Sequence, residues 1–340
     1  MRFYYLPITL LLLTLNLSAQ PADAVELSTK QLALIQSQGA SGIKTVLRES
    51  KIDLQDAAAV HAFVSQIVFN QISEISAPAS ITEITSPLTI EIAKIALADY
   101  GSDKINFVIE TISAGAADGV IKASENSNID VREAIKYASS GSTSGAIHFA
   151  LGNELDTAKA TSAAASGATA GAIKIALGMS YDVLEITKFA SSGSLTSAIY
   201  ESLDANINVG EHIKASAYGS AEASVEAPVI ERFKFMKIVQ SNAAALSAAA
   251  IKASQEENLN IDKNIAYATA GATFGVKQAA NGLGANTRIT INPIPMDPDE
   301  LNLYIVNSFS KEEAQIRRLP IIETSYEDDP DSRQVSPASP

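Results

Sequence analysis

The stretch IDVREAIKYASSGSTSGAIHFAL, residues 129–151, contains the pattern that decides the fold of this chain. An acidic residue stands near its start, residues typical of a helix follow, and Gly141 and Gly145 lie four positions apart near its centre. The same arrangement recurs every 26 residues through the middle of the chain. A fixed period of this length is typical of proteins built from stacked structural repeats.

Small residues mark the centre of every copy, with Ala245 in place of one glycine. The glycines at the two central positions are Gly115, Gly119, Gly141, Gly145, Gly167, Gly171, Gly193, Gly219, Gly271 and Gly275. Each glycine inside a helix costs roughly 0.5–1 kcal/mol relative to alanine, so a repeated glycine indicates a repeated gain in packing. Residues four apart share one face of a helix, and we predict that a neighbouring backbone approaches closely at that face.

A polar residue eleven positions before the central glycine predicts where each helix begins. The residues at this position are Asp130, Asp156, Asp182, Asn208 and Asn260. Their side-chain oxygens accept hydrogen bonds from the unpaired amides of a first helical turn. In several copies a glutamate follows three residues later, which completes a capping-box pattern. We therefore predict a helix N-cap at each of these five residues.

The copy centred on Ala245 indicates that each repeat is a single helix. Residues 231–253 contain no glycine or proline and are rich in strong helix formers. We expect helices of about 20 residues, roughly 30 Å long, with short joints that make successive helices antiparallel. Apolar residues six positions before and six positions after the centre lie on two sides of the helix, as in an inner member of an array. The sequence predicts an all-α array, either α-solenoid-like or a closed bundle.

The chain divides into four segments. Arg2, an apolar run over residues 6–15 and an A-x-A site at residues 22–24 are typical of a cleaved secretory signal peptide. Pro87 is expected to open a helix, because proline is favoured at the first helical position. We predict a signal peptide over 1–24, divergent helical repeats over 25–100, regular repeats over 101–284, and a proline-containing linker, a short helix and an acidic disordered tail over 285–340.

Composition restricts the chemistry that this chain can perform. It contains no cysteine, which rules out disulfides, thiol nucleophiles and cysteine metal ligands. The net charge of −13 disfavours nucleic acid, because binding there depends on Lys and Arg at the phosphates. His61, His148 and His212 lie at unrelated repeat positions, and no spacing typical of a metal site occurs. We predict no catalytic, cofactor-binding or metal-binding residue.

These patterns favour an exported, periplasmic or extracellular protein that is a non-enzymatic scaffold. It is expected to self-associate or to bind a protein partner. A first alternative is a membrane-active or lipid-binding protein that uses its G-x-x-x-G faces in a bilayer. Charged residues inside the helices, such as Arg132 and Lys188, disfavour it, because each costs roughly 2.5–3.5 kcal/mol or more at bilayer depth. A second alternative is an enzyme of unknown type, which would need a carboxylate beside His148 or His212.

Overall fold

The computed structural model describes residues 27–73, 75, 77–230, 236–286, 306–307 and 309–310. These residues form helices and joints and contain no strand. The helices are α1 (Thr29–Gln38), α2 (Ala40–Glu49), α3 (Ala57–Ile72), α4 (Ser80–Tyr100), a short 3-10 helix (Ser102–Lys104), α5 (Ile105–Ser124), α6 (Val131–Gly152), α7 (Thr157–Gly178), α8 (Val183–Asp204), α9 (Val209–Ile230), α10 (Met236–Glu256) and α11 (Ile261–Asn286). The all-α prediction is confirmed. The predicted signal peptide and most of the predicted tail lie outside the described residues.

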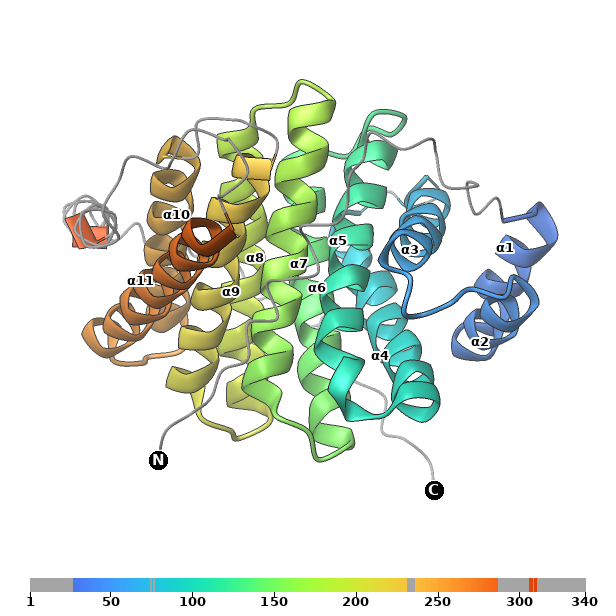
Figure 1. Ribbon diagram of the computed structural model, residues 1–340, viewed down its shortest axis with the longest axis horizontal. Helices are drawn as coiled ribbons and strands as arrows, with labels where there is room; N and C mark the ends of the chain where they lie inside the picture. Colours follow the sequence, from blue (N-terminus) through green and yellow to red (C-terminus); the bar gives the residue numbers. More distant parts are fainter. Residues whose placement is uncertain are drawn as a thin grey trace, which may run out of the picture.

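The helices form an array of two layers. The most extensive contacts join helices that are two apart in the chain, so α3, α5, α7, α9 and α11 form one layer and α4, α6, α8 and α10 form the other. Successive helices meet between the layers. Their order along the array follows their order along the chain, from blue to orange in Figure 1. An inner helix therefore has neighbours on three sides, which explains its two apolar stripes.

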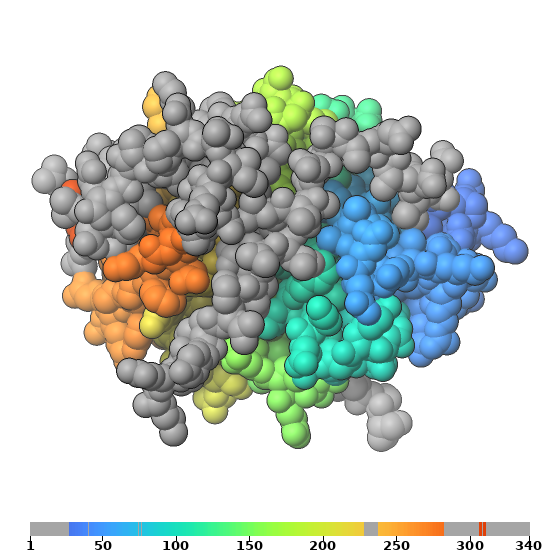
Figure 2. All heavy atoms as spheres, in the orientation of Figure 1, coloured from blue at the N-terminus to red at the C-terminus, as the bar shows by residue number. Residues whose placement is uncertain are grey.

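Small side chains fill the space between the helices. Alanine, isoleucine and valine dominate the buried residues, and fully buried aromatic rings such as Phe63 and Phe149 are few among the described residues. Figure 2 shows one face of the molecule, with the blue and teal N-terminal helices and the orange α11 at opposite ends. Because the side chains are short, the distance between helices is set largely by how closely two backbones approach.

The central glycines lie where two helices of one layer touch. Gly167 of α7 lies against the backbone of Glu110 in α5, and Gly193 of α8 lies against the backbone of Lys136 in α6. Glu110 and Lys136 each stand five positions before the central glycine of their own helix. In both pairs that helix lies two repeats earlier in the chain than the helix it contacts. At all ten central glycines an added Cβ would come closer than 3.0 Å to an atom of another helix. The close approach is thus made within a layer, between repeats that are not consecutive.

The five polar residues before the helices accept hydrogen bonds from first-turn amides. Asp130 accepts from the amide of Arg132 at 2.9 Å, and Asp156 accepts from that of Lys159 at 3.0 Å. The other three caps accept in the same way: Asp182 from the amide of Leu184 at 3.0 Å, Asn208 from that of Glu211 at 3.3 Å, and Asn260 from that of Lys263 at 2.9 Å. Each helix of the regular array from α6 to α9, and α11, therefore begins at a fixed residue of its repeat.

The joints use a backbone device that the sequence analysis did not anticipate. A residue thirteen positions after the centre adopts a left-handed conformation; these residues are Glu154, Ser180, Asn206 and Asn258, with φ of 55°, 62°, 53° and 52°. The next amide then donates to a carbonyl five residues earlier, as from Leu155 to Ala150 at 2.9 Å. This is a Schellman motif, which usually carries glycine at the left-handed position. Here, side chains with a Cβ occupy it.

Replacing Glu154 with glycine is expected to raise the free energy of unfolding by about 0.5–1 kcal/mol. A Cβ in the left-handed region is strained, and glycine removes this strain at some cost in unfolded-chain entropy. Urea denaturation followed by circular dichroism measures the change. Glu154→Ala is the control, because alanine keeps the Cβ and should give no gain. A gain of equal size in both variants would mean that the glutamate side chain, and not the backbone, is unfavourable there.

Two features of residues 25–100 differ from expectation. Pro87 does not open a helix, because α4 begins at Ser80 and continues through the proline. The first turns of α4 are held by packing: Thr82 and Thr85 lie directly against Gly141 of α6. Tertiary contact thus outweighs the local penalty of an internal proline, about 3 kcal/mol. At the N-terminal end, Gly39 at φ 52° divides α1 from α2, and each of these two helices has only 10 residues.

Candidate functional site

Three glutamates of the odd-numbered layer lie close enough to one another to interact electrostatically. Glu110 belongs to α5, and Glu222 and Glu226 belong to α9, the two neighbours of α7. All three side chains are half-buried. Between them, α7 contributes Ser166 and Lys174, which interact with the glutamates. We call the three carboxylates, with these two residues of α7, the carboxylate face.

Glu110 is held by both its backbone and its side chain. Its carbonyl lies against Gly167, and its Oε1 accepts a hydrogen bond from Ser166 Oγ at 3.0 Å. Burial raises the pKa of Glu110 to about 6, against the opposing effects of the Ser166 hydrogen bond and the Lys174 charge. The carboxyl group therefore changes its charge near pH 6.

The two glutamates of α9 are affected more strongly. Burial raises the pKa of Glu222 to about 7, the charge of Glu110 adds to this, and the hydroxyl of Tyr218, which donates at 3.0 Å, opposes it. Burial also raises the pKa of Glu226 to about 8, together with the charges of Glu222 and Glu110 and against that of Lys174. The groups repel one another across α7, so they act as one electrostatic unit.

An aromatic pair borders the carboxylate face. Phe274 of α11 is 46% exposed, and its ring lies 5.6 Å from that of Tyr218, centre to centre. Tyr218 in turn donates to Glu222, which joins the rings to the carboxylates. An exposed aromatic ring beside charged groups is typical of surfaces that bind other molecules.

The sequence contained a signal for this site that the sequence analysis did not use. Tyr218 and Glu222 stand one position before and three positions after the central Gly219. The same positions hold Ser166 and Ala170 in α7. Helix packing is the same in both repeats, because it depends on the glycine, while the chemistry at these positions changes. The two repeats thus share their packing and differ in the side chains that they present at these two positions.

Of the predicted structural residues, Gly167 lies beside this site, because it packs against the backbone of Glu110. The central glycines are occupied by neighbouring backbones, and the five caps lie at the joints. Asp118 of α5 is buried, and it accepts hydrogen bonds from Ser65 and from Lys122, each at 2.7 Å. The hydrogen bond from Ser65 thus ties α3 to α5. Burial lowers the pKa of the nearby His61, against the opposing charge of Asp118.

The other two histidines join neighbouring helices of a layer. His148 Nε2 lies 2.7 Å from Glu201 Oε2, and half of the His148 side chain is exposed. His212 is buried, with Nε2 at 2.9 Å from Thr157 Oγ1 and Nδ1 at 2.8 Å from the carbonyl of Asn208. The Glu201 carboxylate beside His148 is therefore the feature that the enzyme alternative requires. Within the described residues, no group of three or more His, Cys, Asp and Glu side chains is placed to hold a metal ion.

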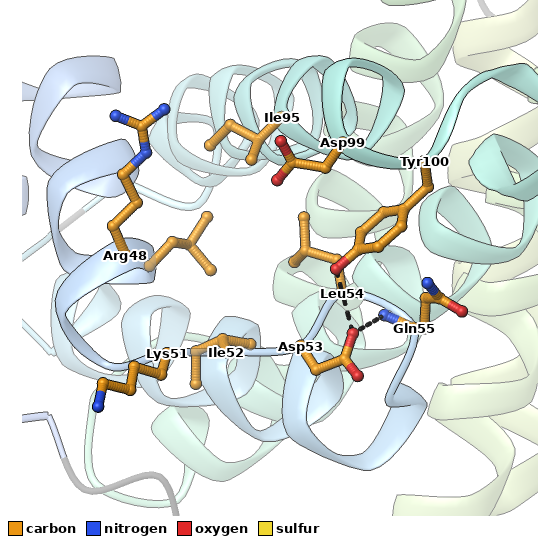
Figure 3. Close-up of a pocket in the computed structure, with 10 residues that line it drawn as sticks. Arg48, Lys51, Ile52, Asp53, Leu54, Gln55, Ile95, Asp99 and Tyr100 are labelled. Atoms are coloured by element: carbon orange, nitrogen blue, oxygen red, sulfur yellow. Dashed lines mark hydrogen bonds between the residues drawn. The ribbon is translucent and has the colours of Figure 1, made fainter.

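A cleft of about 460 Å³ lies between α2, the joint that follows it and the end of α4. Arg48 and Lys51 stand at one side, and Asp53, Asp99 and Tyr100 at the other (Figure 3). Asp53 Oδ1 accepts hydrogen bonds from the Tyr100 hydroxyl at 3.2 Å and from the backbone N–H of Gln55 at 2.9 Å. These bonds hold α4 to the joint, so the polar groups stabilise the end of the array.

None of the helices in the described part of the chain has the length and apolar character needed to cross a membrane. A scan against protein-family models, a search of curated proteins and a search of solved structures each find no match to this chain. The class of protein is therefore defined by the fold itself, a helical-repeat array in two layers. Its function has to be argued from the carboxylate face.

Proposed function

We propose that this protein is an exported, non-enzymatic scaffold that binds a protein partner at the carboxylate face. One observation carries the proposal: within a layer of equivalent helices, α5 and α9 place three carboxylates about α7, and beside them the exposed Phe274 of α11 pairs with the half-buried Tyr218 of α9. Repeat arrays commonly bind partners over extended surfaces of this kind. Export, periplasmic or extracellular, is proposed from the N-terminal sequence.

The chemistry of the face indicates a cationic partner with an apolar anchor. Lysine and arginine side chains form charge-assisted hydrogen bonds with carboxylates, and Arg is frequent at the centres of interfaces. The rings of Phe274 and Tyr218 provide apolar area for a neighbouring side chain. A surface rich in glutamate is a poor site for nucleic acid. The partner segment that fits is a basic peptide with an aromatic or aliphatic residue.

The raised pKa values give this binding a defined pH dependence. A cationic partner favours ionised glutamates, while protons compete for the carboxylates of Glu222 and Glu226, with pKa values of about 7 and 8. Binding must therefore release protons. The affinity for a basic peptide is expected to increase as pH rises from 6.5 to 8.5.

Peptide display against the full chain tests the proposal. We expect selection at pH 8 to enrich peptides that combine Lys or Arg with an apolar residue. The double variant Glu222→Gln/Glu226→Gln should lose these peptides. The matched control is Asp204→Asn/Glu257→Gln, which removes two exposed carboxylates elsewhere and should keep them. Equal enrichment on both variants, or no enrichment on the wild type, would contradict a partner site at the carboxylate face.

The membrane alternative is less well supported. The central glycines lie against backbones of other helices, so a bilayer would have to displace those helices before it could contact the glycine faces. Separating them would expose a core of alanine, isoleucine and valine along the whole array. Self-association remains the second form of the scaffold proposal, and sedimentation of the full chain across a concentration series measures it.

A further inference from the structure

In the odd-numbered layer, each helix receives the central glycines of the next helix of that layer on its backbone. The last helix, α11, has no following helix among the described residues, so its equivalent surface is not covered in this way. In α9, the backbones of Lys214 and Tyr218 receive Gly271 and Gly275 of α11. The equivalent residues of α11 are Ala266 and Ala270, and both are exposed. A repeat array that simply ends exposes a packing surface, and terminal caps normally cover it.

A residue from beyond the array reaches this end. Phe309 is 2% exposed and belongs to an apolar cluster whose other buried members come from α8, α9, α10 and α11. One turn earlier, Val306 is 41% exposed, and its carbonyl accepts a hydrogen bond from Ser310 Oγ at 3.0 Å. Phe309 and Val306 therefore differ sharply in burial although they lie three residues apart. Figure 1 shows their fragment, in red, at the same end of the array as α10 and α11.

We propose that the turn with Val306 and Phe309 is the C-terminal cap of the array. Phe309 is its anchor, and the occupant of the site is this chain's own C-terminal segment. When Phe309 is removed, the apolar cluster formed by α8, α9, α10 and α11 becomes accessible at an end where Ala266 and Ala270 are already exposed. A second copy of the chain offers the same surface, so loss of the cap leads to self-association through these ends. This proposal does not depend on the carboxylate face.

Hydrogen exchange of the full chain, measured by mass spectrometry, tests the cap. In Phe309→Ala, amide exchange in α10 and α11 is expected to increase at least tenfold, while exchange in α5 to α7 stays at the wild-type rate. Val306→Ala removes a similar apolar side chain from an exposed site and should change neither. Phe309→Leu keeps an apolar anchor and should largely restore protection. Unchanged exchange in α10 and α11, or an equal increase along the whole array, overturns the proposal.

Sedimentation of charged variants at the same two positions tests the consequence for assembly. Phe309→Asp, which places a charge in the apolar cluster, is expected to give a mass that rises with concentration over the range in which Val306→Asp matches the wild type. If Phe309→Asp sediments as the wild type does, the end is not an association surface. Basic peptides should bind all three Phe309 variants as they bind the wild type, which separates this result from a failure at the carboxylate face.

Discussion

Gly167→Leu is expected to lower the free energy of unfolding by about 3 kcal/mol or more, or to prevent folding altogether. A Cβ at this position would come closer than 3.0 Å to the carbonyl oxygen, carbonyl carbon and Cα of Glu110. All three are backbone atoms, so no rotamer change relieves the clash and α5 has to move away from α7. Overpacking of a tight core typically costs 1–3 kcal/mol, and a clash between two backbones lies at the upper end or beyond. Urea and thermal unfolding followed by circular dichroism measure the loss.

Gly178→Ala is the matched control within the same helix. Gly178 is the last residue of α7, and nothing lies within 4 Å of an added Cβ. Alanine should therefore be neutral or should stabilise the protein by about 0.5–1 kcal/mol, because it restricts the unfolded chain. If Gly167→Leu melted at the wild-type temperature, the close contact between α5 and α7 would be refuted.

Stability is expected to fall as pH rises from 6.5 to 8.5. In the unfolded chain Glu222 and Glu226 have ordinary pKa values near 4.5, whereas in the folded protein the pKa values are raised to about 7 and 8. The folded state thus binds more protons in this window and loses their stabilising effect as they dissociate. One pKa unit corresponds to about 1.4 kcal/mol, so we expect a loss of at least that size. Below this window, the lowered pKa of half-buried His61 acts in the opposite direction.

The variant Glu110→Gln/Glu222→Gln/Glu226→Gln isolates this effect. Its melting temperature at pH 8.5 should exceed that of the wild type, and its pH dependence between 6.5 and 8.5 should be nearly flat. The control Asp204→Asn/Glu257→Gln should keep the wild-type slope. If the wild type melts at the same temperature at both pH values, the three carboxylates do not form one electrostatic unit.

Much of the architecture could be predicted because the same residue pattern recurs in several copies along the chain. One copy with Ala245 in place of glycine indicated that each repeat is a single helix, and Asp or Asn at a fixed position marks the start of α6, α7, α8, α9 and α11. The layer arrangement could not be predicted in the same way. A glycine such as Gly193 indicates that a backbone comes close, but it does not indicate that the backbone is that of Lys136, two repeats earlier.

The remaining features depend on tertiary context. Glu154 and Ser180 adopt the left-handed conformation although neither is a glycine, so the joint imposes this conformation on them. Pro87 continues a helix because α6 packs against the turn before it. The carboxylate face unites residues more than a hundred positions apart, Glu110 and Glu222, whose shared neighbour is α7. Their raised pKa values arise from burial, which sequence spacing does not report.

Liposome flotation of residues 25–340 at pH 8 and at pH 6.5 distinguishes the proposed scaffold from a lipid-binding protein. If the glycine faces are filled by neighbouring helices and binding takes place at the carboxylate face, the protein stays in the bottom fraction with both neutral and anionic vesicles at both pH values. Its helical circular dichroism spectrum is then unchanged. If the protein floats with the vesicles, its glycine-faced helices interact with lipid and the scaffold proposal is wrong.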